Sequence, residues 1–148
     1  STALGISSVV PAFSVGPDHP VGGGVSERRG IYFIPNASRK FRRNKPVHLY
    51  FEVYNLTPNE SGITSYEITY TITQKGKTTF QKALALFGGG QKPSISVSAA
   101  GLGESSTAAE YVALDLRKAG RGEFRLDVAV KDSHSADKVE ASLDVELE

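Results

Sequence analysis

Strict alternation of apolar and polar side chains constrains the fold of this chain more than any other feature. In residues 47–54, the apolar side chains of Val47, Leu49, Phe51 and Val53 are each separated by one residue. Successive side chains of a β-strand point to opposite faces, so this spacing predicts a strand that buries one face. The same pattern recurs in three further segments, residues 66–72, 124–131 and 139–147. No helical period of comparable length occurs, so the chain is expected to be all-β.

Weaker strand candidates lie around and between these segments and raise the expected number of strands to eight or nine. They are residues 4–10, 31–34, 78–87, 95–97 and 111–116. Small and polar residues at Asp132–Asp137 predict a hairpin between the last two strands. Many short strands separated by regular turns indicate a single Ig-like or fibronectin-III-like β-sandwich whose strands are mostly antiparallel.

A chain of 148 residues fits one domain, here residues 1–148. Within it, residues 1–30 are expected to hold an N-terminal strand and a loop rich in Gly and Pro at 14–30. Residues 31–147 are expected to form the core of the sandwich. The chain starts at Ser1 and contains no Met, so we expect that it was processed or excised from a longer protein.

Composition excludes several functional classes. The formal net charge is +1, which does not fit a general nucleic-acid binder. The absence of Cys excludes disulfides, zinc ribbons and thiol catalysis. No apolar run approaches the ~20 residues of a membrane-spanning helix. The charge is uneven, because residues 1–45 carry seven basic and two acidic side chains, whereas residues 104–148 carry six and eleven.

The order of several motifs resembles one protein family. Ile34–Phe41 reads Ile-Pro-Asn-Ala-Ser-Arg-Lys-Phe and leads into the strand at 47–54, and Leu114-Asp115-Leu116 precedes an alternating segment at 122–132. This order resembles the C-terminal β-rich region of bacterial GWxTD domain-containing proteins over roughly residues 31–147. There, a PNPSR-aromatic stretch precedes a YFEIYNL strand, and LDL leads to PGxYxLxVxVxD. The chain departs from these motifs at three positions, Ala37, Arg121 and Phe124, and the GWxTD motif itself is missing because the chain has no Trp.

The resemblance implies an Ig-like accessory domain of an extracytoplasmic bacterial protein that is periplasmic, attached to the envelope or secreted. The name-giving domain of the family would then lie outside this chain. The family supplies no catalytic residue that could be transferred to it.

Candidates for catalysis and metal binding are few. The three histidines, His19, His48 and His134, are scattered and follow neither the spacing of a metal site nor that of a catalytic triad. The segment 132–137 lacks the Gly and the final Glu of a calcium loop. We therefore predict no catalytic residue, no metal, no cofactor and no enzymatic activity.

A run of positive charge is the most distinctive local feature. Five cations occupy the seven positions 39–45 and form the basic segment: Arg39, Lys40, Arg42, Arg43 and Lys45. Such a density of charge could bind an anionic polysaccharide or anionic lipid headgroups. Alternatively, these charges are solvated, face the acidic C-terminal third, or protect a sheet edge. The solvated interpretation is favoured because most charge runs are simple surface. Phe41 is expected to pack inward and to turn Lys40 and Arg42 outward.

Two tyrosines form a second candidate site. Tyr50 and Tyr54 share a strand face with His48 and Glu52. If this face is exposed, it offers an aromatic stripe to a partner or a sugar. If a loop such as 14–30 covers it, the tyrosines belong to a second layer of core, and we favour this second interpretation.

Asn-x-Ser/Thr triplets begin at Asn36, Asn55 and Asn59. They are glycosylation acceptors in a eukaryotic secreted protein and turn formers in a bacterial one. We prefer the turn interpretation.

The sequence thus predicts a non-enzymatic binding or interaction domain of a larger bacterial envelope or secreted protein. Expected partners are a neighbouring domain or protein, or an anionic polysaccharide or lipid surface, without nucleic acid and without a membrane span. Two alternatives stay open: a structural spacer, and an accessory module that docks on a catalytic domain through a contiguous apolar patch. The identity of the ligand and the oligomeric state do not follow from the sequence.

Overall fold

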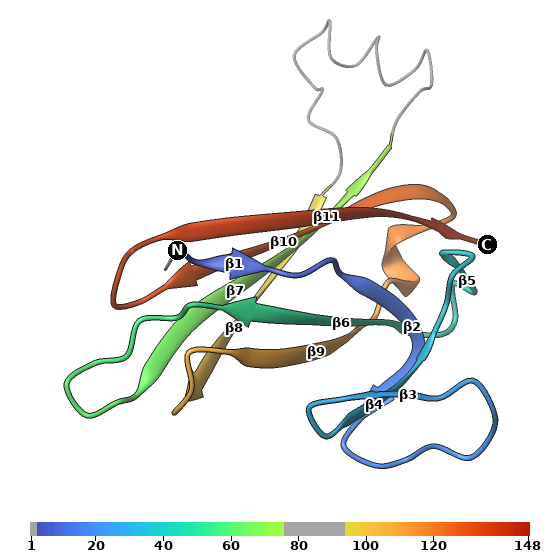
Figure 1. Cartoon of the computed structure of the whole chain (residues 1–148). Helices are drawn as coiled ribbons and strands as arrows, with labels where there is room; N and C mark the ends of the chain where they lie inside the picture. The colour runs from blue at the N-terminus through green and yellow to red at the C-terminus, as the bar shows by residue number, and fades with distance from the viewer. Residues whose placement is uncertain (1–2, 76–93) are drawn as a thin grey trace, which may run out of the picture.

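The computed structural model describes residues 3–75 and 94–148 and shows two β-sheets packed face to face (Figure 1). The all-β sandwich predicted from the alternation is therefore confirmed, with eleven strands in the described residues instead of eight or nine. The first sheet contains β1 (Gly5–Ile6), β2 (Val10–Gly16), β3 (Ser26–Arg28), β4 (Ile31–Pro35), β6 (Val47–Tyr54) and β9 (Ala108–Leu114). The second contains β5 (Lys40–Phe41), β7 (Thr64–Gln74), β8 (Ser94–Gly103), β10 (Gly122–Asp132) and β11 (Lys138–Leu147).

Strand pairing is antiparallel except where β5 runs parallel to β11. In the second sheet the order is β5-β11-β10-β7-β8. In the first sheet β6 is central, with β9 on one side and β1 and β2 on the other, and β2 continues through β4 to β3. A single turn of 3-10 helix, Arg117–Ala119, precedes β10. The described part of the chain contains no helix long and apolar enough to cross a membrane.

One hydrophobic core lies between the sheets and follows the predicted alternation. Val47, Leu49, Phe51 and Val53 of β6 are fully buried. From the second sheet they meet the inward side chains of β7, β10 and β11, namely Tyr66, Ile68, Tyr70, Ile72, Phe124, Leu126, Val128, Val130, Leu143, Val145 and Leu147. The two sheets therefore share one core, as two packed antiparallel sheets do.

The predicted hairpin of the last two strands is confirmed, since β10 and β11 pair in register from Gly122↔Leu147 to Lys131↔Lys138. Buried Asp132 holds its turn: its carboxylate accepts hydrogen bonds from the backbone N–H of His134 at 3.0 Å and of Thr57 at 2.8 Å. The second bond fastens the hairpin to the segment that follows β6.

The N-terminal region differs from the prediction. The candidate strand at 4–10 divides into β1 and β2, and the supposed loop at 14–30 contains the end of β2 and all of β3. Backbone pairing to β4 is the reason: Val15 pairs with Phe33 and Ser26 with the same residue from the other side. A bulge between Ala12 and Ser14 breaks the period of two in β2, so alternation could not reveal it. The predicted strand at 78–87 lies outside the described residues.

Candidate functional site

The basic segment lies at one edge of the second sheet, where β5 pairs with the end of β11. Phe41 is only 4% exposed and joins the core, whereas Lys40 and Arg42 on either side are exposed. The prediction that Phe41 packs inward and turns its neighbours outward is confirmed. The core therefore anchors the segment through one aromatic ring and leaves its cations on the surface.

A buried asparagine holds the start of the basic segment. Asn36 donates from Nδ2 to the Lys40 carbonyl at 2.8 Å, and its Oδ1 accepts a hydrogen bond from the Ser38 hydroxyl at 2.6 Å. At the other side, the backbone N–H of Glu146 donates to the Arg39 carbonyl and that of Glu148 to the Phe41 carbonyl, both at 2.9 Å. The backbone of the segment is thus tied to both its own start and the C-terminal strand.

The other two triplet asparagines also bond the backbone. Asn59 Oδ1 accepts from the N–H groups of Ser61 and Ile63, and Asn55 donates to the Ala3 carbonyl. Asn36 and Asn59 thus make the local contacts of turn formers, whereas Asn55 bonds a residue 52 positions away.

The acidic C-terminal strand neutralises little of the positive charge. Lys40 Nζ lies 3.9 Å from Glu146 Oε2, and both side chains are about half exposed. Within residues 3–75 and 94–148, no carboxylate lies within 4.0 Å of the cationic groups of Arg39, Arg42, Arg43 or Lys45. An exposed pair at this distance contributes little, so the basic segment keeps most of its charge available.

A hollow of about 340 Å³ opens beside these cations and is lined by Phe13, Phe41, Arg42, Lys45 and Pro46. Phe13 of β2 is 59% exposed, and its ring centroid lies 6.3 Å from that of Phe41. The hollow therefore has an aromatic floor and a cationic rim. Sequence reasoning missed Phe13, because nothing local shows that β2 carries it next to the distant basic segment.

Tyr50 lies on the opposite face of the first sheet from the core and is itself buried. Its ring stacks on Phe33 of β4 with centroids 4.8 Å apart and an interplanar angle of 14°, and Ala12 completes this second cluster. At 2% exposure Tyr50 offers no ring face to a ligand, so the second-layer interpretation is correct for it. The ring stacked on it is Phe33 of β4, and Val15 from the segment 14–30 packs against the same cluster. Tyr54 is half-buried at the end of β6 opposite Gly5.

A buried carboxylate lies next to Tyr50. Glu52 is 5% exposed, and its Oε1 accepts a hydrogen bond from Arg29 Nε at 2.9 Å. Its Oε2 lies 3.6 Å from the Arg28 guanidinium and accepts a hydrogen bond from the Tyr50 hydroxyl at 3.2 Å. Arg28 ends β3 and Arg29 follows it in the turn to β4, so this cluster fastens that hairpin to β6.

The cluster fixes the protonation of its members. Burial alone would raise the pKa of Glu52, but the hydrogen bonds from Arg29 and Tyr50 and the charges of both arginines outweigh it and lower that pKa. Burial and the neighbouring Glu52 charge raise the pKa of Tyr50 to about 12. The carboxylate is therefore charged and the phenol neutral at physiological pH. A groove of about 510 Å³ lies over the cluster, walled by Val10, Phe33 and Pro35 among others.

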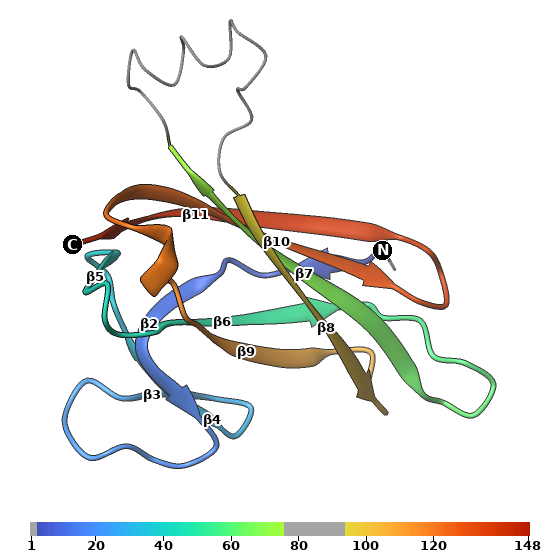
Figure 2. The same ribbon diagram turned by 180° about the vertical axis from the view of Figure 1, so that it is seen from behind.

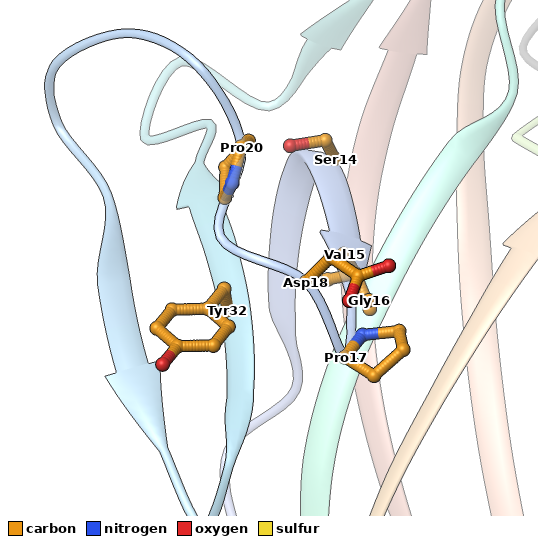
Figure 3. Close-up of a pocket in the computed structure, with 7 residues that line it drawn as sticks. All are labelled: Ser14, Val15, Gly16, Pro17, Asp18, Pro20 and Tyr32. Carbon is orange, nitrogen blue, oxygen red and sulfur yellow. The ribbon is translucent and has the colours of Figure 1, made fainter.

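A third hollow, of about 300 Å³, lies between the end of β2 and the β3–β4 hairpin (Figure 3). Its wall includes the Tyr32 ring, Pro17 and Pro20, with the Asp18 carboxylate as the charged group. The three histidines lie apart from one another, on the loop after β2, on β6 and at the β10–β11 turn. Within the described ranges, no three His, Asp or Glu side chains gather as a metal site would require.

The fold and these surfaces define a β-sandwich with an exposed cationic and aromatic hollow at one end. Comparison of the sequence with models of known protein families and with curated proteins found no match.

Proposed function

We propose that this β-sandwich is a non-enzymatic binding domain that attaches to anionic lipid surfaces through the basic segment and Phe13. One observation carries the proposal: the exposed Phe13 ring and two cations without a carboxylate partner among the described residues, Arg42 and Lys45, line one hollow. Arg39 and Arg43 of the same segment have no such partner among the described residues either. Cations near an anionic membrane contribute about 1 kcal/mol each, and an aromatic ring enters the boundary between headgroups and acyl chains. Cations alone would suit any anionic ligand, and an exposed ring alone would suit any apolar one. Because the two lie side by side, they favour a ligand that is both anionic and apolar.

The shape of the basic segment supports a lipid surface over a soluble polymer. An acidic polysaccharide is bound chiefly through its charges, whereas an anionic membrane also offers an apolar phase to an exposed aromatic ring. The lipid interpretation uses Phe13, which is exposed beside Arg42 and Lys45. The resemblance to the C-terminal region of GWxTD proteins supports a setting in a larger bacterial envelope or secreted protein, where such surfaces are available.

Vesicle co-sedimentation tests this proposal. We would compare phosphatidylcholine vesicles with vesicles that also contain phosphatidylglycerol, at low and physiological salt. The variant replaces all five cations of the basic segment by Glu. Its matched control replaces five exposed cations elsewhere by Glu and therefore has the same net charge: Arg117, Lys118, Arg121, Lys131 and Lys138.

We expect binding to the anionic vesicles only, lost in the basic-segment variant and mostly retained in the control. If both variants lost binding equally, the overall charge of the protein would explain the binding, and the proposal of a defined site would be contradicted. Binding to a soluble acidic polysaccharide but not to vesicles would show that the ligand is a polysaccharide and would contradict the lipid proposal. No binding to either would leave the basic segment as solvated surface.

A structural spacer is the second candidate function. β1 begins at one end of the sandwich and β11 finishes at the other, in both views (Figures 1 and 2). Chain segments attached at the two ends would therefore be held apart by the length of the sandwich. The absence of binding in the vesicle and polysaccharide experiments would favour this candidate.

A further inference from the structure

The outer edge of β8 differs from every other sheet edge in the described structure. Over its ten residues, Ser94–Gly103, β8 contains no charged residue and no proline. It pairs along its whole length with β7, from Thr64↔Gly103 to Thr73↔Ser94. Among residues 3–75 and 94–148 no strand pairs with its other side, which forms the margin of the second sheet (Figure 2).

The remaining edges are protected in the ways natural sheets use. β1 and β5 have only two residues each, and β5 includes Lys40. β3 has three residues and includes Glu27 and Arg28. β9 has seven residues and carries Glu110. Short edges and charged side chains discourage pairing with other chains, whereas a long uncharged edge is a template for it. Protection is thus missing at β8 alone.

Apolar side chains are exposed along the unprotected edge. Val97 and Ala99 pair with buried Tyr70 and Ile68, so they point to the core side of the sheet, yet both are exposed and Val97 is 43% exposed. Leu102, on the other face, is 77% exposed. The core-side face of β8 therefore extends beyond the cover of the first sheet, and its outer face adds an exposed Leu.

The edge is also held in place. Tyr66 of β7 lies across Gly101 so closely that a Cβ there would be 2.2 Å from the ring. The Tyr66 hydroxyl donates a hydrogen bond to the Glu110 carboxylate of β9, which links the two sheets beside β8. The strand to which β8 is paired is therefore joined to both sheets.

We propose that two copies of this chain pair through β8, strand against antiparallel strand, and join their second sheets into one continuous sheet. A two-fold axis builds the contact from the same strand in both copies, so a strand without charged residues pairs with itself without repulsion. β8 meets this condition, and β3, β5 and β9 do not.

The alternation restricts the register. Directly opposed residues of two antiparallel strands point to the same face of the sheet. The two-fold axis, which is perpendicular to the sheet, must therefore lie between the two copies of one residue and not between two neighbouring positions. An axis at Ala99 sets Val97 of each copy opposite Gly101 of the other, where the Tyr66 ring fills the space of the missing side chain. Small residues at the centre, Ala99 and Ala100, allow the two backbones to approach.

Sedimentation velocity over a range of protein concentrations tests the association, without vesicles or any other ligand. We expect a monomer–dimer equilibrium in the wild-type chain. Val97→Lys places a charge on the edge and should shift the equilibrium to the monomer by at least tenfold in Kd. Tyr111→Lys is the matched control, because Tyr111 is also 43% exposed but lies on β9. It should dimerise like the wild type.

A cross-link tests the register independently of any change in folding. The chain has no Cys, so Ala99→Cys introduces a single thiol. Directly opposed residues of an antiparallel pair lie ~4.5–5.5 Å apart between Cα atoms, within the range of a disulfide. Mild oxidation should therefore yield a covalent dimer from Ala99→Cys and not from Tyr111→Cys.

A monomer at every concentration would overturn the proposal, including the case in which β8 accepts a strand of a different protein. A dimer that Val97→Lys leaves intact and that Ala99→Cys fails to cross-link would place the contact elsewhere and overturn it too. Neither result bears on lipid binding by the basic segment, which lies at the opposite edge of the second sheet.

Discussion

At the scale of single residues, two buried carboxylates depend on partners that local sequence does not reveal. Glu52 alternates with core residues and could have pointed to solvent, but Arg28 and Arg29 cover it from a hairpin more than twenty positions away. Asp132 looked like the polar start of a hairpin, and its second partner, the Thr57 N–H, comes from the segment after β6. The sequence shows where these carboxylates are, but it does not show their partners, because the partners lie on distant segments that only the fold brings together.

These two carboxylates predict how stability depends on pH. The pKa of Asp132 is lowered, because hydrogen bonds from Thr57, His134 and Ser135 outweigh its burial, and the pKa of Glu52 is lowered too. The unfolded chain, with pKa values of about 4, therefore binds more protons in acid than the native state does. The stabilisation is fully present above the unfolded values and is lost as the pH falls through the folded ones.

Urea unfolding at a series of pH values checks this dependence. We expect the free energy of unfolding to fall below about pH 5. Glu52→Gln should cost about 1.5–3 kcal/mol at neutral pH, since it weakens hydrogen bonds to a charged group, and should flatten the decline in acid. Glu146→Gln is the control, because its exposed pair with Lys40 contributes little. An unchanged slope in Glu52→Gln would contradict the assignment.

Gly101 provides a second prediction for one residue. Its Cβ position lies 2.2 Å from Tyr66, so Gly101→Ala must displace that ring and its bond to Glu110. We expect a loss of about 1–3 kcal/mol of stability, as for other overpacked sites. Thermal unfolding of Gly101→Ala, with Gly103→Ala as the control at a roomier position, measures it. A loss in Gly103→Ala as large as that in Gly101→Ala would refute this steric account.

At the scale of elements, alternation predicted the strands that bury one face in the core. It did not predict the strands that are defined only by backbone hydrogen bonds to a neighbour. Four strands, β6, β7, β10 and β11, each bury one face in the core, and their apolar side chains alternate accordingly. β3 and β5 are too short to show any period, and a bulge interrupts β2. The face of β6 that holds Tyr50 stayed ambiguous, because its cover, Phe33, lies on a strand whose position the sequence does not reveal.

The β3–β4 hairpin predicts the behaviour of one turn. Arg29 and Gly30 connect the paired residues Arg28 and Ile31 with φ values of 51° and 78°, the form of a two-residue hairpin turn with both φ positive. Gly30→Ala forces a side chain into this region, at a cost of about 1–2 kcal/mol. It should also loosen Arg29 from Glu52.

Chemical denaturation of Gly30→Ala alone and combined with Glu52→Gln measures this coupling. If the turn acts through the cluster, the double variant should lose less than the sum of the two single losses. Strict additivity would show that the turn and the cluster stabilise the hairpin separately.

At the scale of the whole molecule, the charge asymmetry was visible in the sequence but its consequence was not. The acidic C-terminal third does run beside the basic segment, through β5 and β11, yet the contact is made by backbone hydrogen bonds and a single long ion pair. The sandwich thus places opposite charges next to each other without cancelling them. Phe13 completes the surface from a third element, and for this reason the aromatic half of the candidate site could not be predicted.

The cations and Phe13 of the candidate site should respond differently to salt when the domain binds vesicles. Salt screens the attraction between cations and anionic headgroups over about 8–10 Å at physiological strength, whereas it does not weaken the burial of an aromatic ring. Phe13→Ala should therefore weaken binding to vesicles with phosphatidylglycerol by about the same factor at low and at high salt, whereas the loss caused by the basic-segment variant should shrink as salt rises. Because Phe13 is 59% exposed, the substitution should leave stability nearly unchanged. Tyr111→Ala removes an exposed ring from β9 and serves as the control. If Phe13→Ala binds these vesicles as tightly as the wild type at every salt concentration, the ring takes no part in binding and only the cations hold the domain to the surface.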